Sequence, residues 1–145
     1  MTASPAPIIR DHIVQVLRAA DAEPIMQTPE CQIRAALDVS GEPRGPYGII
    51  VAAADLGGHG GLPGRVLVDV RVTITVFTHL DEDADGHRLD DLASAVMETI
   101  PSIGVAVPGW HIRFAGVWQL DETTMDDVFR TADITATLYL QACNP

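Results

Sequence analysis

The sequence contains no lysine: nine of its 145 residues are basic, and all nine are arginine. Without lysine the chain cannot form a Schiff base with a carbonyl substrate, and it lacks the residue that contacts phosphates in a P-loop. Twenty acidic residues bring the net charge to −11, and the pI is about 4.5. Such an excess of acid leaves no large basic patch for the phosphates of nucleic acids. The composition therefore argues against lysine-dependent enzymes and nucleic-acid-binding proteins.

Cysteine is scarce, and long apolar runs are missing. Cys31 and Cys143 lie far apart, so we expect two free thiols rather than a disulfide framework. No stretch of about 18 uninterrupted apolar residues is present, and the first residues lack the basic and apolar regions of a signal peptide. We therefore expect a protein that stays in the cytoplasm where it is made, or leaves it by lysis, and that does not enter a membrane.

Charged residues make up 20% of the chain, whereas 47% of the residues are hydrophobic, and the mean hydropathy is +0.17. A chain of this length typically forms one domain. We expect a single domain over residues 1–145, in which residues 1–7 form a disordered tail. Apolar surface that one domain cannot bury has to be covered by a partner. The composition thus favours an oligomer.

Apolar residues recur with two different periods along the chain. Helical spacing predicts two amphipathic helices, over residues 8–21 and 87–100. Alternation of apolar and polar residues predicts half-buried strands over residues 31–39, 66–77, 110–118 and 129–141. A nearly continuous apolar run predicts a further, covered strand over residues 47–54.

Glycine and polar residues separate these elements. Residues 55–65 hold five glycines, which predicts an exposed flexible loop, and residues 119–127 are expected to form a polar loop. The predicted order is α-β-β-β-α-β-β. This order predicts an α+β fold: a single domain with a mostly antiparallel sheet of four to five strands and two main helices on one face.

An acidic loop with the sequence DEDADG precedes the second helix. Asp81, Asp83 and Asp85 alternate and are followed by Gly86, as in the first half of an EF-hand calcium loop. The second half of that motif is missing, because Leu92 stands where the bidentate glutamate belongs. We therefore expect a solvated loop in which Asp85 caps the helix, and we keep the three aspartates as a weak candidate for a calcium site.

The sequence shows no catalytic motif. His79 and His87 flank the acidic loop, but their spacing fits no known zinc pattern. None of the four serines lies in a GxSxG motif, and Cys31 has no electropositive surroundings in the sequence. We predict that the protein is not an enzyme and needs no cofactor. A small hydrolase that uses scattered acids stays open as an alternative.

Two tryptophans bracket the strand predicted over residues 110–118. Trp110 and Trp118 are eight residues apart, so an uninterrupted strand would present both on the same face. Packing in the core is the simpler interpretation. A contact between subunits is the alternative, because tryptophan is enriched at the energetic centres of interfaces.

Several segments together carry a resemblance to a known family. They are TITVFTH (residues 73–79), DLASAV (91–96), GWHI (109–112) and the closing segment RTADITATLYLQ (130–141). In this order they resemble the tail terminator, or tail completion, proteins of long-tailed bacteriophages. The resemblance covers residues 8–141. Other phage neck and tail-completion proteins look similar, so they remain an alternative.

The resemblance implies a structural virion protein at the head-proximal end of the tail, assembled in the host cytoplasm. It implies a ring, typically a hexamer, that caps the tail tube, stops tube polymerisation and joins the tail to the neck or head. The implied partners are further copies of the chain, the tube protein, a neck or head–tail connector protein and, in contractile tails, the sheath. DNA would pass through the ring without specific binding. The resemblance implies no catalytic residue.

The charge pattern suggests where such a ring would make contacts. Residues 81–91 and 119–127 hold ten of the twenty acids. Our hypotheses are that these acids line the lumen and repel DNA, or that they dock electrostatically onto a neighbouring ring. A calcium-responsive binding module built on the DEDADG loop is a further alternative. The candidate interface residues are His59, Asp81, Glu82, Asp83, Asp85, Trp110, Trp118, Asp121, Glu122, Asp126 and Asp127.

Overall fold

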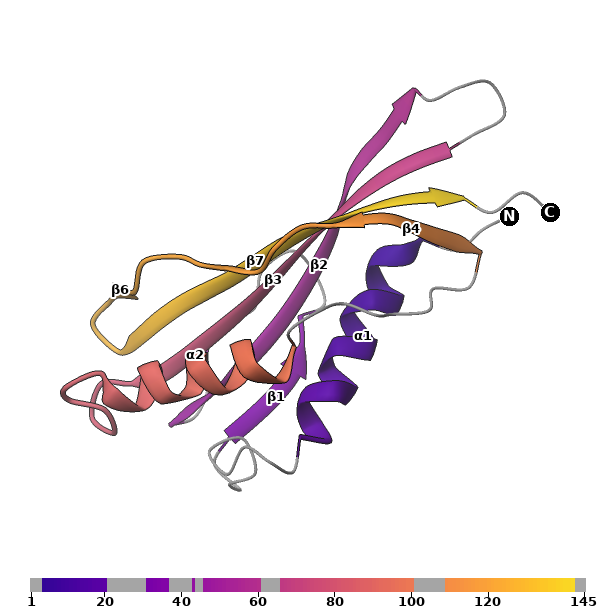
Figure 1. The fold of residues 1–145 in the computed structure, drawn as a ribbon. Coiled ribbons are helices and arrows are strands. Elements are labelled where there is room, and N and C mark those ends of the chain that lie inside the picture. Colours follow the sequence, from indigo (N-terminus) through magenta and orange to yellow (C-terminus); the bar gives the residue numbers. More distant parts are fainter. Residues whose placement is uncertain are drawn as a thin grey trace.

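A computed structural model describes residues 4–20, 31–36, 43, 46–60, 66–100 and 109–142. These residues form two helices and seven strands, with both helices on the same side of the sheet (Figure 1). The elements in chain order are α1 (Pro5–Arg18), β1 (Cys31–Ala35), β2 (Tyr47–Gly60), β3 (Val66–His79), α2 (His87–Thr99), β4 (Trp110–Ala115), β5 (Gln119–Leu120), β6 (Thr124–Met125) and β7 (Phe129–Ala142). The predicted α+β class and element order are confirmed, and β5 and β6 are additional. In this part of the chain, neither helix is long and apolar enough to cross a membrane.

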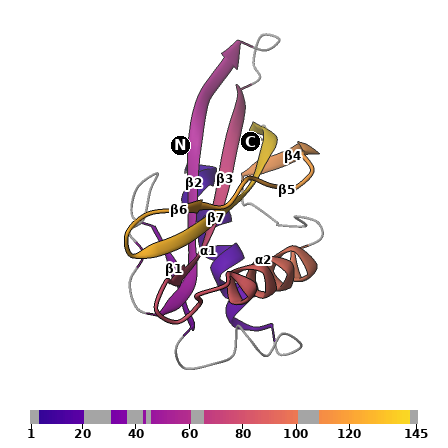
Figure 2. The ribbon, with the colours of Figure 1, turned by 90° about the vertical axis from the view of Figure 1, so that its left-hand side faces the viewer.

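The strands form one mixed sheet with the order β1-β2-β3-β7-β4, and β5 and β6 also pair with β7. The prediction of four to five strands therefore matches the main path and misses the two short strands. Every pairing is antiparallel except that of β1 with β2, which is parallel. The central pairing joins β3 to β7 over nearly their whole lengths, and Figure 2 shows β2 and β3 running side by side toward the end away from α2.

The main core lies between the sheet and the two helices. Alternate residues of β3 and β7 are buried there, as expected for the half-buried strands predicted from the alternating pattern. The fully buried side chains of the core include Ile9, Leu17, Ile49, Val51, Val70, Val72, Ile74, Val76, Leu92, Val96, Ile134 and Leu138. Burial of each such side chain stabilises the fold by about 1.5–3 kcal/mol relative to an exposed position.

The opposite side of the sheet is called the bare face here, because no helix in the described part of the chain covers it. Its side chains in β3 and β7 are mostly threonine, aspartate and arginine, so the face is polar along its middle. A small second cluster stands at one end, where Ala36, Ile50 and Phe77 are buried. The Phe77 ring meets the Phe129 ring edge to face, with 5.7 Å between centroids.

Two predicted boundaries were wrong near glycine and proline. Strand β2 does not end at residue 54 but continues to Gly60 through a bulge between Asp55 and Gly58, because the chain keeps pairing with the first residues of β3. The flexible loop expected over residues 55–65 is therefore a strand up to Gly60. Helix α1 begins at Pro5 rather than at residue 8, since proline is favoured in the first turn of a helix.

The strand predicted over residues 110–118 is interrupted. Strand β4 ends at Ala115, and the chain then follows the same edge of β7 in short pieces, β5 and β6. The Gly116 N–H still donates to the Thr137 carbonyl at 2.8 Å. A Cβ at Gly116 would lie 3.0 Å from that oxygen, so the close approach favours glycine. The polar loop expected over residues 119–127 thus contains two short strands.

Candidate functional site

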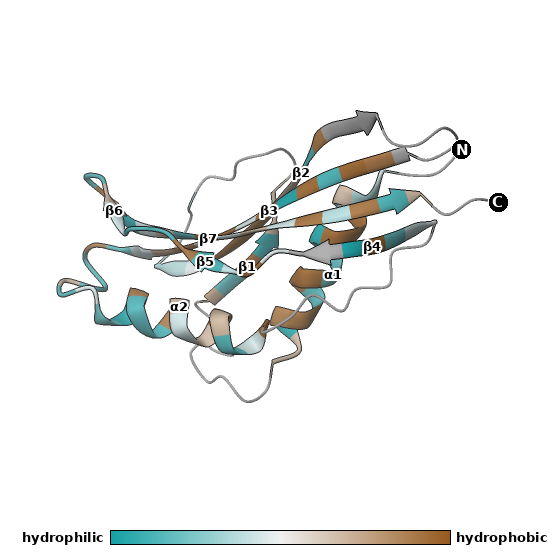
Figure 3. Ribbon diagram, turned by 45° about the horizontal axis from the view of Figure 1, so that its top comes forward, coloured by the Kyte–Doolittle hydropathy of each residue, from teal (hydrophilic) through white to brown (hydrophobic). Residues whose placement is uncertain are grey.

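The two acidic segments of the sequence lie side by side at one end of the molecule. The last residue of β3, His79, is paired with the first residue of β7, Phe129. The Leu80 N–H also donates to the Val128 carbonyl at 2.9 Å. The exposed acids of this acidic end are Asp81, Glu82, Asp85, Asp90, Asp91, Asp126 and Asp127. Figure 3 shows hydrophilic residues at the start of α2 and around β6, so the acidic end is a strongly charged surface.

Asp83 is an exception among these acids, because its side chain is buried. Its carboxylate accepts hydrogen bonds from the N–H groups of Arg88 and Leu89, each at 3.0 Å, and from the Thr78 hydroxyl at 2.9 Å. Burial alone would raise the pKa of Asp83. The three hydrogen bonds and the charge of Arg130 outweigh it, and the pKa is lowered below its usual value. Asp83 therefore stays ionised and holds the start of α2.

This contact corrects the predicted helix cap. Asp85 accepts a hydrogen bond from the His87 N–H at 3.1 Å, but Asp83 satisfies the next two free N–H groups of α2. The backbone of Gly86 has φ +82°, a left-handed conformation that glycine adopts without strain. The tight turn at Gly86 brings the chain from Asp83 back over the end of its own helix.

A guanidinium group stabilises the acidic loop from outside. Arg130, at the start of β7, donates from Nε to the carbonyl oxygen of Asp83 at 3.1 Å and from Nη2 to that of Ala84 at 2.8 Å. In a calcium-binding loop, carbonyl and carboxylate oxygens turn toward the metal ion. Here two loop carbonyls turn toward a cation that belongs to the chain itself.

The three aspartates of the calcium candidate do not converge. The Asp83 carboxylate is fully engaged by protein donors, whereas the side chains of Asp81 and Asp85 are exposed. No group of three or more acidic, histidine or cysteine side chains within the described ranges is arranged to hold a metal ion. Leu92, at the position of the bidentate ligand, is fully buried in the core. The geometry does not favour a calcium site.

The two histidines beside the loop pair with its acids at the surface. His79 Nδ1 lies 3.7 Å from an Asp81 carboxylate oxygen, and His87 Nδ1 lies 3.4 Å from one of Asp85. His79 also packs edge to face against Phe129, with 5.4 Å between ring centroids. These exposed pairs shape the loop surface, and a shallow hollow of about 460 Å³ lies over it.

A second hollow, of about 250 Å³, lies on the bare face. Arg71, Thr73, Asp121, Asp133 and Thr135 line it, together with three alanines of β2. The Thr75 hydroxyl donates to Asp133 at 2.7 Å, so one of these carboxylates is already satisfied within the sheet. The hollow is open and polar, and its lining groups suit contacts with another polar surface.

The structure separates the predicted interface residues into buried and exposed groups. Asp83 and Trp118 are buried inside the chain, where they stabilise the helix start and the core, and they are not available at a surface. Trp110 is half-buried and packs against the main core, although the strand between the two tryptophans is broken. The exposed members are Asp81, Glu82, Asp85, Asp121, Glu122, Asp126 and Asp127. His59 lies in β2, and its side chain is outside the described residues.

Asp126 has a local structural role as well as a surface position. Its carboxylate accepts the N–H groups of Val128 and Phe129, both at 2.7 Å, and thereby closes the turn into β7. Those two hydrogen bonds lower the pKa of Asp126. The turn keeps Asp126 and Asp127 beside the acidic loop.

Sequence reasoning missed two kinds of residue at this end. Arg130 gave no local signal, because the carbonyls that it binds are 46 and 47 residues away in the chain. Exposed apolar side chains were also missed: Val117, Leu120, Met125 and Val128 are between 43% and 80% exposed. All four lie within residues 117–128, in or beside the polar loop predicted over residues 119–127, and this clustering is the signal that could have identified them.

Comparison with known proteins gives a structural relationship without a sequence family. No protein-family model and no curated protein matches the chain. A chain in the solved structure "Virion of native gene transfer agent (GTA) particle" has the same fold, with a TM-score of 0.61 and 14% sequence identity. The match covers 90% of this chain and 92% of the other. At this identity the comparison establishes the fold that the two chains share.

Proposed function

We propose that the protein is a structural virion protein that forms a ring, typically a hexamer, on the head-proximal end of a phage tail tube. The observation that carries this proposal is the shared fold with a chain of a gene transfer agent virion over nearly the full length of both chains. In this role the ring stops tube polymerisation and joins the tail to the neck, and the protein is not an enzyme.

The segments that resemble tail terminator proteins support the same proposal. TITVFTH forms the end of β3, DLASAV lies within α2, and the closing segment forms most of β7. Strands β3 and β7 pair along their length, and α2 packs against both. The resemblance therefore falls on one packed unit of the fold rather than on scattered peptides.

The acidic end suits two roles in such a ring. A strongly negative surface repels the phosphates of DNA, so that DNA slides through a lumen lined with it. The same surface docks electrostatically onto a basic neighbour, such as the tube protein or a neck protein. A structure of the assembled ring distinguishes these roles, because acids outside the lumen rule out the first.

Three measurements test the proposal. Negative-stain imaging of the purified protein is expected to show rings, and addition of the protein to polymerising tail-tube protein is expected to stop growth at the capped end. Antibody labelling of virions is expected to mark the junction of head and tail. A label elsewhere on the particle, together with unchanged tube growth, would assign the chain to another neck or tail-completion protein.

A further inference from the structure

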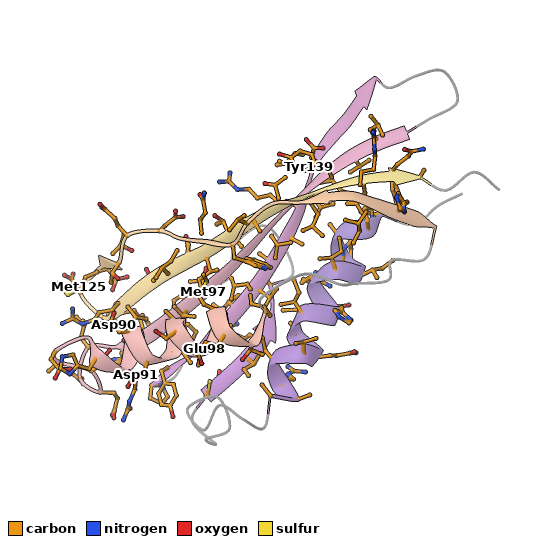
Figure 4. The ribbon with its side chains drawn as sticks, viewed as in Figure 1. Asp90, Asp91, Met97, Glu98, Met125 and Tyr139 are labelled. Carbon is orange, nitrogen blue, oxygen red and sulfur yellow. The ribbon has the colours of Figure 1, made fainter. Side chains whose placement is uncertain are left out.

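Exposed side chains form two regions along β7. Leu120 and Met125 are 52% and 62% exposed beside its first half, and Tyr139 is 41% exposed in its second half, where Arg71 and Arg113 also lie. Figure 4 shows Met125 near the acidic end and Tyr139 far from it along the sheet. Met125 pairs with Arg130, which precedes Tyr139 by nine residues in β7. Met125 and Tyr139 are therefore separated by about 30 Å, at roughly 3.3 Å per strand residue.

The first of these regions, the flap surface, comprises Asp90, Met97, Leu120 and Met125. Leu120 pairs with the buried Ile134, and Met125 pairs with Arg130, so both side chains lie on the face of the sheet that carries α2. Asp90 and Met97 are seven residues apart on α2 and therefore share one side of it. Figure 4 shows that side turned toward β6 and β7. The flap surface is thus apolar, with the negatively charged Asp90 at its edge.

The second region, the arginine surface, comprises Leu67, Arg71, Arg113 and Tyr139. Leu67, Arg113 and Tyr139 line a hollow of about 260 Å³. Arg71 and Arg113 are exposed, and neither makes a hydrogen bond or ion pair within the described part of the chain.

Other arginines are already used inside the chain. Arg10 and Arg18 donate to backbone carbonyls, Arg88 lies over the Tyr47 ring, and Arg130 holds the acidic loop. Arg34 also lacks a hydrogen-bond partner for Nε and Nη2, but these atoms are buried. Among the exposed arginines of the described residues, Arg71 and Arg113 are therefore available for a partner.

We propose that the flap surface of one copy docks onto the arginine surface of the next copy. The two regions are complementary, because one offers exposed apolar side chains beside a carboxylate and the other offers an aromatic ring beside two unpaired arginines. They are different patches on one chain, so the contact is head-to-tail, and a head-to-tail contact that closes forms a ring. This inference rests on the proposed function and names the surfaces that build its ring.

Two variants with surface substitutions test the docking. The flap variant is Leu120→Gln with Met125→Gln. The arginine variant is Arg113→Glu, which places a carboxylate opposite Asp90 of the neighbouring copy. All three positions are exposed, so the fold is retained, as circular dichroism checks. Each variant alone is expected to lose rings and to self-associate about tenfold or more weakly in sedimentation velocity. Leu56→Gln, at a residue that is 56% exposed and outside both surfaces, is the matched control and keeps the rings.

The mixture of the two variants is the decisive measurement. The arginine variant retains an intact flap surface, and the flap variant retains an intact arginine surface, so the mixture forms two-chain complexes that cannot extend. If both variants still form rings, the assignment of the two surfaces is wrong, but the protein still forms a ring. A mixture that stays monomeric overturns the head-to-tail contact. Wild-type protein that stays monomeric at millimolar concentration overturns self-association and the ring of the proposed function, whereas virion labelling tests the virion role separately.

Discussion

Arg130, at the start of β7, binds the backbone of Asp83, with 3.1 Å between its Nε and the Asp83 carbonyl oxygen. The same Asp83 uses its carboxylate to hold the start of α2. One residue therefore links β7 to the loop through its carbonyl and the loop to the helix through its side chain. The acidic loop is a joint between two elements as well as a charged surface.

Replacement of Arg130 is expected to weaken the attachment of the acidic loop to β7. Arg130→Met keeps the apolar stem of the side chain and removes both hydrogen bonds to the loop carbonyls. The free energy of unfolding should fall by about 1.5–3 kcal/mol, the usual contribution of hydrogen bonds from a charged group. Urea unfolding at one dilute protein concentration measures it. The matched control is Arg71→Met, an exposed arginine, which should change stability by no more than about 0.5 kcal/mol.

The lowered pKa of Asp83 predicts how the stability of the protein depends on pH. Its pKa is lowered in the folded chain relative to about 4 in the unfolded chain, so its ionised form stabilises the fold above about pH 4. That stabilisation is lost as the pH falls through the folded pKa. Asp83→Asn should therefore be less stable than wild type at pH 7 by about 0.5–1.5 kcal/mol, the usual contribution of a hydrogen bond, because the amide nitrogen cannot accept the bonds that one carboxylate oxygen accepts. The difference should shrink below about pH 4.

Chemical unfolding from pH 2 to pH 8 measures this dependence. Asp90→Asn, which removes an exposed acid from the same end, is the control and should retain the wild-type acid-induced loss. If the difference in the free energy of unfolding between wild type and Asp83→Asn stays the same from pH 2 to pH 8, the role assigned to the carboxylate is contradicted.

The burial of Trp118 predicts different losses of stability for two substitutions. The side chain is 8% exposed, and its Nε1 has no hydrogen-bond partner within the described residues. Trp118→Ala should lower the free energy of unfolding by about 3–5 kcal/mol, because it leaves a cavity in the core. Trp118→Phe should cost clearly less, since no hydrogen bond is lost. Thermal unfolding compares the two, and Val117→Ala, at the neighbouring 80% exposed residue, should change little.

Calcium is expected not to bind the acidic loop. The Asp83 carboxylate is occupied by three protein donors, and Arg130 occupies two loop carbonyls. Isothermal titration with millimolar calcium should give the same heats as a magnesium titration at equal ionic strength. A saturable heat that disappears in Asp83→Asn would instead favour a calcium-responsive binding module.

The sequence predicted the parts of the fold that depend on local pattern. The alternation in β3 and β7 and the apolar stripe of α2 identified residues that are buried in the core, because each of these elements presents one face to it. The predicted helix start at residue 87 was correct. The predicted cap, Asp85, lies two residues from Asp83, since the free N–H groups of a helix need acceptors close in sequence.

Three of the failures involve partners distant in sequence. Glycines in residues 55–60 suggested a loop, but pairing with β3 overrides that local preference. The break after Ala115 depends on how closely Gly116 approaches Thr137, which the alternating pattern does not record. The contact of Arg130 with the acidic loop depends on β3 and β7 being neighbours, so it could be found only after the sheet was known.

The interrupted edge beside β7 has a consequence for aggregation. A long continuous edge strand offers free N–H and C=O groups on which another chain can polymerise as an amyloid-like sheet. Here the edge is divided into β4, β5 and β6, with a register shift in β4 between Ile112 and Phe114. No segment is both long and regular enough to serve as a template in this part of the chain. Along this edge the unpaired backbone groups are therefore kept from recruiting further strands, which matters for a chain with 47% hydrophobic residues.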